Sequence, residues 1–161
     1  IIDGFLTSVG STYYVLPMEI VSECIEVPPE CALRPDAGVG YFNLRGEVLP
    51  YFDIALLHKV KPAHNGRRSL VVARDGNTRI GLIVDKLHGE YQTVIKPLSS
   101  LFRHLRAIAG STILGSGDVA LVLDVPALVS YAVEATRPGG SGRTPFSLTS
   151  NGSTEQIQQE S

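Results

Sequence analysis

The sequence predicts a mainly β domain built from two similar small units. Short β-prone runs recur along the chain, and turn residues such as Gly, Asn, Asp and Ser separate them. Glycine (16) and proline (10) are plentiful among the 161 residues, as expected for many short elements joined by turns. Hydrophobic residues make up 43% of the chain and charged residues 19%, which indicates a well-filled core and excludes wholesale disorder.

The first half of the chain reads as strands and turns. Residues 5–9 and 12–16 flank Gly10-Ser11 and predict a hairpin, and Pro17 ends the second strand because proline has no N–H for a ladder. The other elements expected here are a short helical turn or irregular strand entry at 18–24, loops at 27–30 and 34–40, a strand at 41–45, a turn at 46–47, a strand at 48–54, one helical turn at 55–60 and a polar loop at 61–66.

The second half repeats this character. Residues 69–73 read as a strand buried on both faces, and Asp75-Gly76-Asn77 is the strongest hairpin turn in the chain. Pro126 suits the first turn of a helix at 127–135. Its apolar stripe is expected to comprise Leu128, Val129, Ala132 and Val133. The remaining expected elements are a return strand at 78–87, a strand at 91–95, a short helix at 98–105 and a hairpin of residues 112–114 and 119–125.

The two ends suggest one domain over residues 1–136 and a disordered linker or tail over 137–161. The tail is rich in Gly, Ser, Thr and Gln, and its few apolar residues are isolated. The first residues carry neither an initiator Met nor a basic region, so we expect the middle of a longer chain and no signal peptide. No apolar run approaches the roughly 18 residues that a membrane span needs.

A faint internal repeat supports the two-unit prediction. Residues 46–57 line up with 117–128, since both have Gly, an acid, Val, an apolar strand ending in Asp, and an apolar helical turn. Residues 10–16 align with 76–82 in the same order along the chain. Hairpins resemble one another, so the alternative is coincidence, but two packed β units would each bury surface that one unit alone leaves exposed.

Charge and ligand patterns exclude several functions. The net charge of −2 gives no electrostatic footprint for nucleic acid or an anionic membrane. The clusters Arg67-Arg68 and 103–106 are expected to be solvated faces. Cys24 and Cys31 are not a Cys-x-x-Cys pair and the histidines are scattered, so no metal site is expected.

Catalytic motifs are missing or better explained by structure. Residues 110–117 resemble a phosphate-binding loop, but Ser116 and Gly117 stand where Lys and Ser or Thr should be, so hairpin glycines explain them better. Asp53, Asp85 and Asp124 end apolar strands, where capping of the next turn is more common than acid–base chemistry. We therefore expect no catalytic residue and no cofactor, and the strand edges point to protein–protein binding.

Three stretches carry a resemblance to a known family. The run Asn43-Leu44-Arg45-Gly46-Glu47-Val48-Leu49-Pro50 resembles the Asn-Leu-Arg-Gly-x-x-x-Pro signature of the CheW-like family. Residues 79–85, Arg-Ile-Gly-Leu-Ile-Val-Asp, resemble its second-half strand. Residues 94–98 and 108–125 are similar to the C-terminal regulatory domain of the chemotaxis histidine kinase CheA. The free adaptor CheW usually lacks this sequence pattern. The resemblance covers residues 1 to about 135.

The resemblance implies two SH3-like five-stranded β-barrels packed around a shared core. It also implies a non-catalytic regulatory domain that binds the adaptor CheW and the cytoplasmic tips of chemoreceptors. The parent chain would be a cytoplasmic, homodimeric histidine kinase associated with membrane receptor arrays, and no nucleic acid or direct membrane insertion is expected. The alternative is a stand-alone CheW-like adaptor in a chemosensory or pilus-sensing system. A third option, an SH3-like enzyme with a new site, has no support in the sequence.

Six residues are candidates for partner binding by alignment with the family. Ile20, Val21 and Glu23 fall after the first hairpin, in the region that faces the partner in the family. Asn43, Arg45 and Glu47 fall at the signature turn, beside the groove between the barrels. Two alternatives stay open: Ile20 and Val21 as plain core, and Arg45 as a structural hydrogen-bond donor to loop carbonyls.

Overall fold

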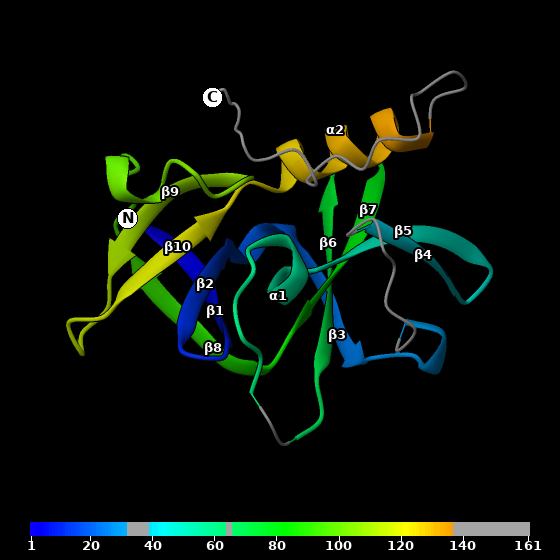
Figure 1. The fold of residues 1–161 in the computed structure, drawn as a ribbon, viewed down its shortest axis with the longest axis horizontal. Helices are drawn as coiled ribbons and strands as arrows, with labels where there is room; N and C mark the ends of the chain where they lie inside the picture. The colour runs from blue at the N-terminus through cyan, green and yellow to red at the C-terminus, as the bar shows by residue number, and fades with distance from the viewer. Residues whose placement is uncertain (32–38, 64–65, 137–161) are drawn as a thin grey trace.

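The computed structural model describes residues 1–31, 39–63 and 66–136, and it places ten strands in two five-stranded sheets (Figure 1). Sheet A contains, in spatial order, β8 (Lys86–Thr93), β1 (Ile2–Val9), β2 (Thr12–Pro17), β10 (Val119–Leu123) and β9 (Ile108–Ile113). Sheet B contains β3 (Val21–Glu26), β6 (Ser69–Asp75), β7 (Thr78–Val84), β5 (Glu47–Asp53) and β4 (Val39–Leu44). The predicted mainly β fold of two five-stranded units is confirmed.

The internal repeat is real, but the two repeats exchange strands. Each sheet joins one hairpin to a second pair of strands through a parallel contact, β2 with β10 in sheet A and β7 with β5 in sheet B. The aligned residues 10–16 and 76–82 supply β2 and β7, while 46–57 and 117–128 supply β5 and β10 with the helices that follow them. Each sheet therefore combines two strands of one repeat with three of the other, and neither repeat forms a unit by itself.

The chain crosses between the sheets at two places. After β2 it passes through the short 3-10 helix η1 (Met18–Ile20) into β3, which accounts for both the helical turn and the strand entry expected at 18–24. After β7 it crosses back at Asp85 into β8, which pairs with β1. The expectation of one return strand over 78–87 is therefore wrong, because β-propensity does not reveal a change of sheet.

Three clusters of buried apolar side chains account for the pattern of apolar residues along the strands. The largest cluster lies between the sheets and includes Tyr14 of β2, Phe52 of β5 and Leu82 of β7. Smaller clusters lie inside sheet B, around Phe42, and inside sheet A, around Val15. Alternate residues of a central strand point to opposite clusters, so the expected double burial of residues 69–73 is confirmed.

The helices complete the shared core. The short helix α1 (Ile54–Leu57) follows β5, and α2 (Val125–Thr136) follows β10 and contacts β6 and β7 across the top of the view in Figure 1. Leu128, Val129 and Ala132 of α2 are buried as expected, but Val133 is 52% exposed and does not belong to the stripe. The short helix expected at 98–105 is reduced to one 3-10 turn, η3 (Ser100–Phe102), after the short η2 (Pro29–Cys31) earlier in the chain.

Two expectations fall on residues outside the described ranges. The tail over 137–161 lies outside them, as does most of the loop expected at 34–40, of which Val39 and Gly40 begin β4. Within the described residues, no helix is long and apolar enough to cross a membrane.

Candidate functional site

The family signature forms the tight turn between β4 and β5. Arg45 (φ 49°) and Gly46 (φ 94°) both have positive φ, as the two central residues of a type I′ hairpin turn require. The side chain of Asn43 accepts a hydrogen bond from the main-chain N–H of Gly46 at 2.8 Å. Asn43 therefore stabilises a turn that presents Arg45 to solvent, with 64% of its side chain exposed.

Four charged side chains, three from strands of sheet B and one from the signature turn, meet here. Arg45 Nη2 lies 2.5 Å from Glu23 Oε2 on β3. Arg79 of β7 pairs with Glu47 of β5, and its other nitrogen, Nη1, lies 4.0 Å from the same oxygen of Glu23. We call Glu23, Arg45, Glu47 and Arg79 the charged cluster.

Three of these four residues were predicted from the sequence and one was not. Glu23, Arg45 and Glu47 are brought together, and Arg79 joins Glu23 to Glu47. No sequence signal pointed to Arg79, because its role depends on β7 lying between β6 and β5. The alternative role of Arg45 as a donor to loop carbonyls is replaced by an ion pair with a carboxylate.

The cluster is well suited to recognition and poorly suited to stabilising the fold. Glu47 is 48% exposed and Arg45 is 64% exposed. Pairs that are so accessible to water typically contribute about 0.2–1 kcal/mol to stability. Alternating charges on a rigid sheet surface can instead give a partner electrostatic complementarity and a fixed register.

The predicted apolar anchors have a different setting. Ile20 and Val21 are half-buried and pack against the core between the sheets, so much of their apolar surface is already used. On the hairpin that carries the signature turn, Val48 is 65% exposed and Tyr41 is 43% exposed. Sequence reasoning missed both, although exposed apolar residues beside a predicted turn are a usable signal.

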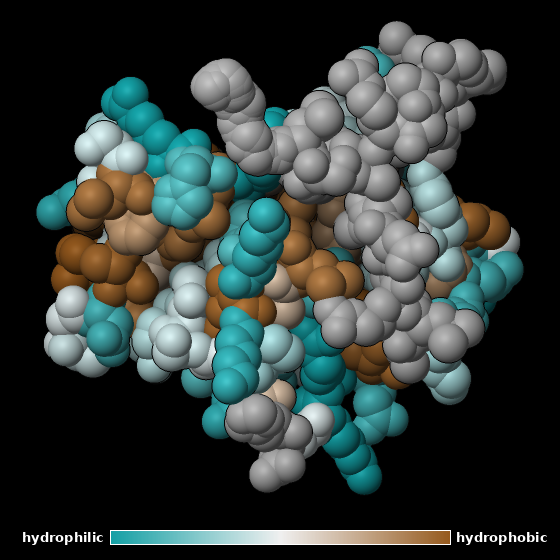
Figure 2. Space-filling model, in the orientation of Figure 1, coloured by the Kyte–Doolittle hydropathy of each residue, from teal (hydrophilic) through white to brown (hydrophobic). Residues whose placement is uncertain are grey.

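Other exposed apolar side chains concentrate on sheet A. Of the eleven large apolar side chains that are exposed among the described residues, eight belong to sheet A or to segments that precede or join its strands: Ile1, Leu87, Tyr91, Val94, Ile95, Leu101, Ile113 and Val119. Figure 2 shows hydrophobic surface gathered over β9 and β10 at the left of the molecule. The charged cluster thus lies on sheet B, whereas most of the exposed large apolar side chains lie on or beside sheet A.

Capping is confirmed for two of the three strand-end aspartates. Asp53 accepts from Ala55 N at 3.0 Å at the start of α1, and Asp124 accepts from Ala127 N at 3.0 Å at the start of α2. Asp85 does not cap a helix. Its carboxylate accepts from the main-chain N–H groups of Gly10 at 2.6 Å and Ala63 at 2.8 Å.

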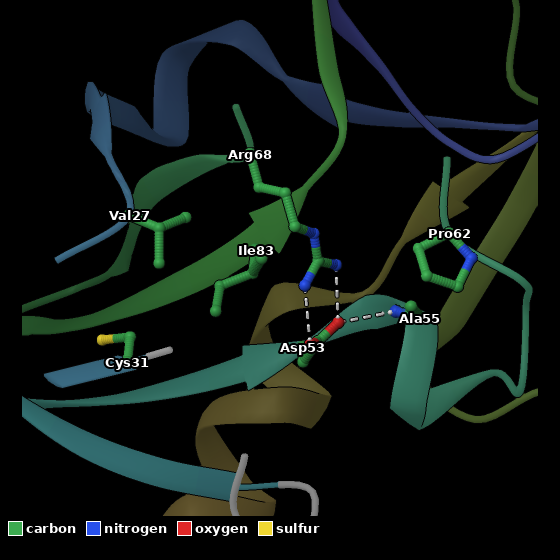
Figure 3. A pocket seen from close by; sticks show the side chains of 7 residues that line it. All are labelled: Val27, Cys31, Asp53, Ala55, Pro62, Arg68 and Ile83. Carbon is green, nitrogen blue, oxygen red and sulfur yellow. Dashed lines mark hydrogen bonds and ion pairs between the residues drawn. The ribbon is translucent and has the colours of Figure 1, made fainter. Parts of the chain in front are cut away.

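Arg68 is not part of a solvated face, contrary to the expectation. It donates two hydrogen bonds to Asp53, at 2.9 and 3.0 Å (Figure 3). It also donates one to Asp85 at 3.2 Å. These carboxylates raise the pKa of Arg68 against the opposing effect of burial. The group borders a hollow of about 320 Å³ that is otherwise lined mainly by apolar side chains and the thiol of Cys31.

The groups needed to bind a metal ion do not come together in the described part of the chain. Among those residues, no group of three or more His, Cys, Asp or Glu side chains is placed to hold a metal ion. Cys24 is exposed, Cys31 is buried, and both are free thiols. Burial and the charge of Glu30 raise the pKa of Cys31 to about 11, which keeps it protonated and weakly nucleophilic.

Comparisons with known proteins point to one family. A model of the CheW-like domain matches residues 3–133. The chain is 36% identical to the chemotaxis protein CheA of Salmonella typhimurium over 131 residues, which are 80% of this chain and 19% of that protein. It is 32% identical to the sensor histidine kinase CheAY of Helicobacter pylori over 134 residues, which are 82% of this chain and 17% of that protein.

A solved structure agrees on the fold. The scaffolding protein TtCheW from Thermoanaerobacter tengcongensis superimposes with a TM-score of 0.61 at 20% identity, covering 75% of this chain and 87% of that one. The chain spans about a fifth of the length of the curated CheA relatives that it matches.

Proposed function

The chain belongs to the CheW-like domain family, and from that premise we propose that it is the docking and regulatory domain of a chemotaxis histidine kinase. In this proposal it performs no chemistry. It binds the adaptor CheW and the cytoplasmic tips of chemoreceptors, at receptor arrays, and couples their state to a kinase domain elsewhere in a homodimeric parent protein. The observation that carries the proposal is the similarity to CheA over four fifths of the chain.

The charged cluster is the proposed recognition surface of sheet B. Arg45 and Glu47 flank Gly46 on a turn held by Asn43, so both charges have a fixed position. Glu23 and Arg79 hold their partners in place from neighbouring strands. A partner with complementary charges would gain register from these four residues without having to order a flexible loop.

The apolar anchors in this proposal are Val48 and Tyr41, on the β4–β5 hairpin that carries the signature turn. Interfaces commonly surround a few buried apolar or aromatic anchors with a polar rim. Ile20 and Val21 would add the part of their surface that the core between the sheets leaves exposed.

Regulation would work through linkage. A domain without catalytic groups can change kinase activity only if its partners bind two arrangements of the assembly with different affinity. The charged cluster on sheet B and the exposed apolar side chains on and beside sheet A suit such a role, because two partners could bind at once.

A stand-alone adaptor is the second candidate. The family model matches residues 3–133, nearly all of the described chain, and the same architecture occurs in a scaffolding protein. The two candidates predict different genetic behaviour. An adaptor should restore chemotaxis to cells that lack CheW, whereas a kinase domain should do so only when it replaces the matching region of CheA.

A calorimetric titration of the 161-residue chain with purified CheW tests the proposal. Saturable binding with micromolar affinity, unchanged by ATP, is expected. Replacing Arg45 by Glu should weaken it, whereas the same change at Arg67, which forms a more exposed ion pair with Glu26, should not. Binding to neither CheW nor receptor tips at high concentration would contradict the proposal.

A further inference from the structure

A chain of partly buried polar contacts links sheet B to sheet A. It runs from Ala55 N through the Asp53 carboxylate to the Arg68 guanidinium, then through Asp85 to the main-chain N–H of Gly10. Asp53 ends β5 of sheet B, whereas Gly10 lies in the β1–β2 hairpin of sheet A. The central link, Asp85, sits where the chain leaves one sheet for the other.

The charges in this chain are buried deeply enough to cost free energy. The side chains of Asp53 and Asp85 are only 6% and 5% exposed, and two carboxylates share one guanidinium. Removing charges from water costs several kcal/mol per ion, at order of magnitude, so a buried ion pair is weak evidence for stability. Apolar residues of similar size could fill the same space at lower cost, and the retained charges therefore point to a geometric role.

The internal repeat provides a comparison inside the same molecule. Gly10 and Gly76 begin equivalent strands 66 residues apart. The same offset places Ile2 at the position of Arg68 and Glu19 at the position of Asp85. Glu19 is exposed, and the described residues contain no ion pair that involves it. The other crossing thus forms without an ion pair, which indicates that the fold itself does not need one.

From these observations we propose that the Arg68–Asp85 ion pair sets the orientation of sheet A relative to sheet B and is dispensable for forming either sheet. Arg68 would be a positioning residue. It keeps the charged cluster on sheet B at a fixed distance from the apolar surface on sheet A. Each hydrogen bond has directional requirements, which the apolar contacts of the shared core lack.

Pulsed electron paramagnetic resonance on the full 161-residue chain tests this directly. Asn77→Cys on sheet B and Ser116→Cys on sheet A, both in exposed turns, carry the spin labels. Cys24→Ser and Cys31→Ala remove the native thiols. Arg68→Gln should shift or broaden the distance distribution at temperatures well below the unfolding midpoint. Arg68→Lys, which keeps the charge, should restore part of the parental distribution, and the neighbouring Arg67→Gln is the control.

Two results would overturn the proposal. The first is a parental distance distribution in folded Arg68→Gln, which would mean that the ion pair contributes to stability but does not set the orientation of the sheets. The second is failure to fold even after the charges have been removed. Arg68→Gln alone leaves two buried carboxylates unpaired, and it could fail to fold for that reason. If that variant does not fold, the neutral combination Arg68→Gln, Asp53→Asn and Asp85→Asn takes its place. A folded neutral variant with a broadened distribution supports the proposal, and one that also fails to fold shows that the ion pair is a requirement of the fold.

Discussion

Arg45 and Glu23 lie 2.5 Å apart, measured from Nη2 to Oε2, and they join the two edges of sheet B. Glu23 belongs to β3 at one edge, whereas Arg45 follows β4 at the other. Sheet A brings its outer strands together differently, through two main-chain hydrogen bonds between Lys96 and Ser111 at 2.8 and 3.0 Å. The family signature therefore lies where the two edges of sheet B come together.

Reversing the charge of Arg45 should weaken partner binding and leave the fold intact. Arg45→Glu places two carboxylates together, and we expect adaptor affinity to fall by about tenfold or more, since unfavourable charge contacts at interfaces cost several kcal/mol. The midpoint of thermal unfolding should change little, because exposed pairs contribute about 1 kcal/mol or less. Titration calorimetry and circular dichroism measure the two effects.

The reciprocal exchange separates recognition from sheet closure. If Arg45 acts only by holding Glu23, then Arg45→Glu combined with Glu23→Arg should restore binding. If Arg45 or Glu23 itself contacts the partner, affinity should stay low in the double variant although the pair is restored. An affinity equal to the parental value in the single variant, with a native spectrum, would remove Arg45 from the recognition surface.

Val48 should act as an apolar anchor on the β4–β5 hairpin. Val48→Gln should lower adaptor affinity without changing stability by more than about 0.5 kcal/mol, as is usual for exposed positions. Val133→Gln on α2 is a matched control, because these side chains are 65% and 52% exposed. Equal losses of affinity in both variants would show that the effect is not specific to the β4–β5 hairpin.

The hydroxyl of Thr93 is buried and has no hydrogen-bond partner among the described residues. Thr93→Val keeps the shape and removes this unsatisfied group, so the free energy of unfolding should rise by about 1 kcal/mol. Thr7 on the neighbouring strand β1 provides the opposite case, because its hydroxyl donates to the carbonyl of Tyr14 at 3.0 Å. Thr7→Val should therefore lower stability, and urea titrations of the two variants should show opposite signs.

Local patterns predicted the strands well because each strand carries its own signal. Both aligned repeats supplied equivalent strands, and the turns at Gly10 and Gly76 lie where Gly and Asn or Ser predicted them. What the sequence could not reveal was strand exchange between the repeats. The change of sheet at Asp85 leaves no trace in β-propensity, so residues 78–87 read as one strand.

Long-range ion pairs explain the other differences. Arg67 and Arg68 are adjacent arginines that the sequence does not distinguish, yet the Arg67 side chain is 88% exposed while Arg68 bridges two buried carboxylates. Their partners become close only after β5, β6 and β7 have assembled. Arg79 escaped prediction for the same reason. By contrast, the cap at Asp124 was predictable because its partner, Ala127, is three residues away.

Buried His58 should make stability depend on pH. Its Nε2 lies 2.7 Å from the carbonyl oxygen of Arg106, which can only accept, so Nε2 carries the proton. Its Nδ1 then accepts from the hydroxyl of Tyr14 at 2.9 Å. Burial lowers the pKa of His58, the hydrogen bond to Arg106 opposes this by a smaller amount, and an electrostatic interaction with His104 adds a still smaller decrease.

The sign of the dependence follows from that lowered pKa. An unfolded histidine binds a proton near pH 6.5, whereas the folded domain binds it only at lower pH. Stability should be fully present above about pH 6.5 and should fall as the pH drops below that value toward the lowered pKa. Urea unfolding between pH 5 and 8 should show this loss in the parental chain. His58→Gln should remove most of the slope, whereas substitution of the exposed His88 should keep it. An unchanged slope in His58→Gln would mean that other groups carry the acid sensitivity.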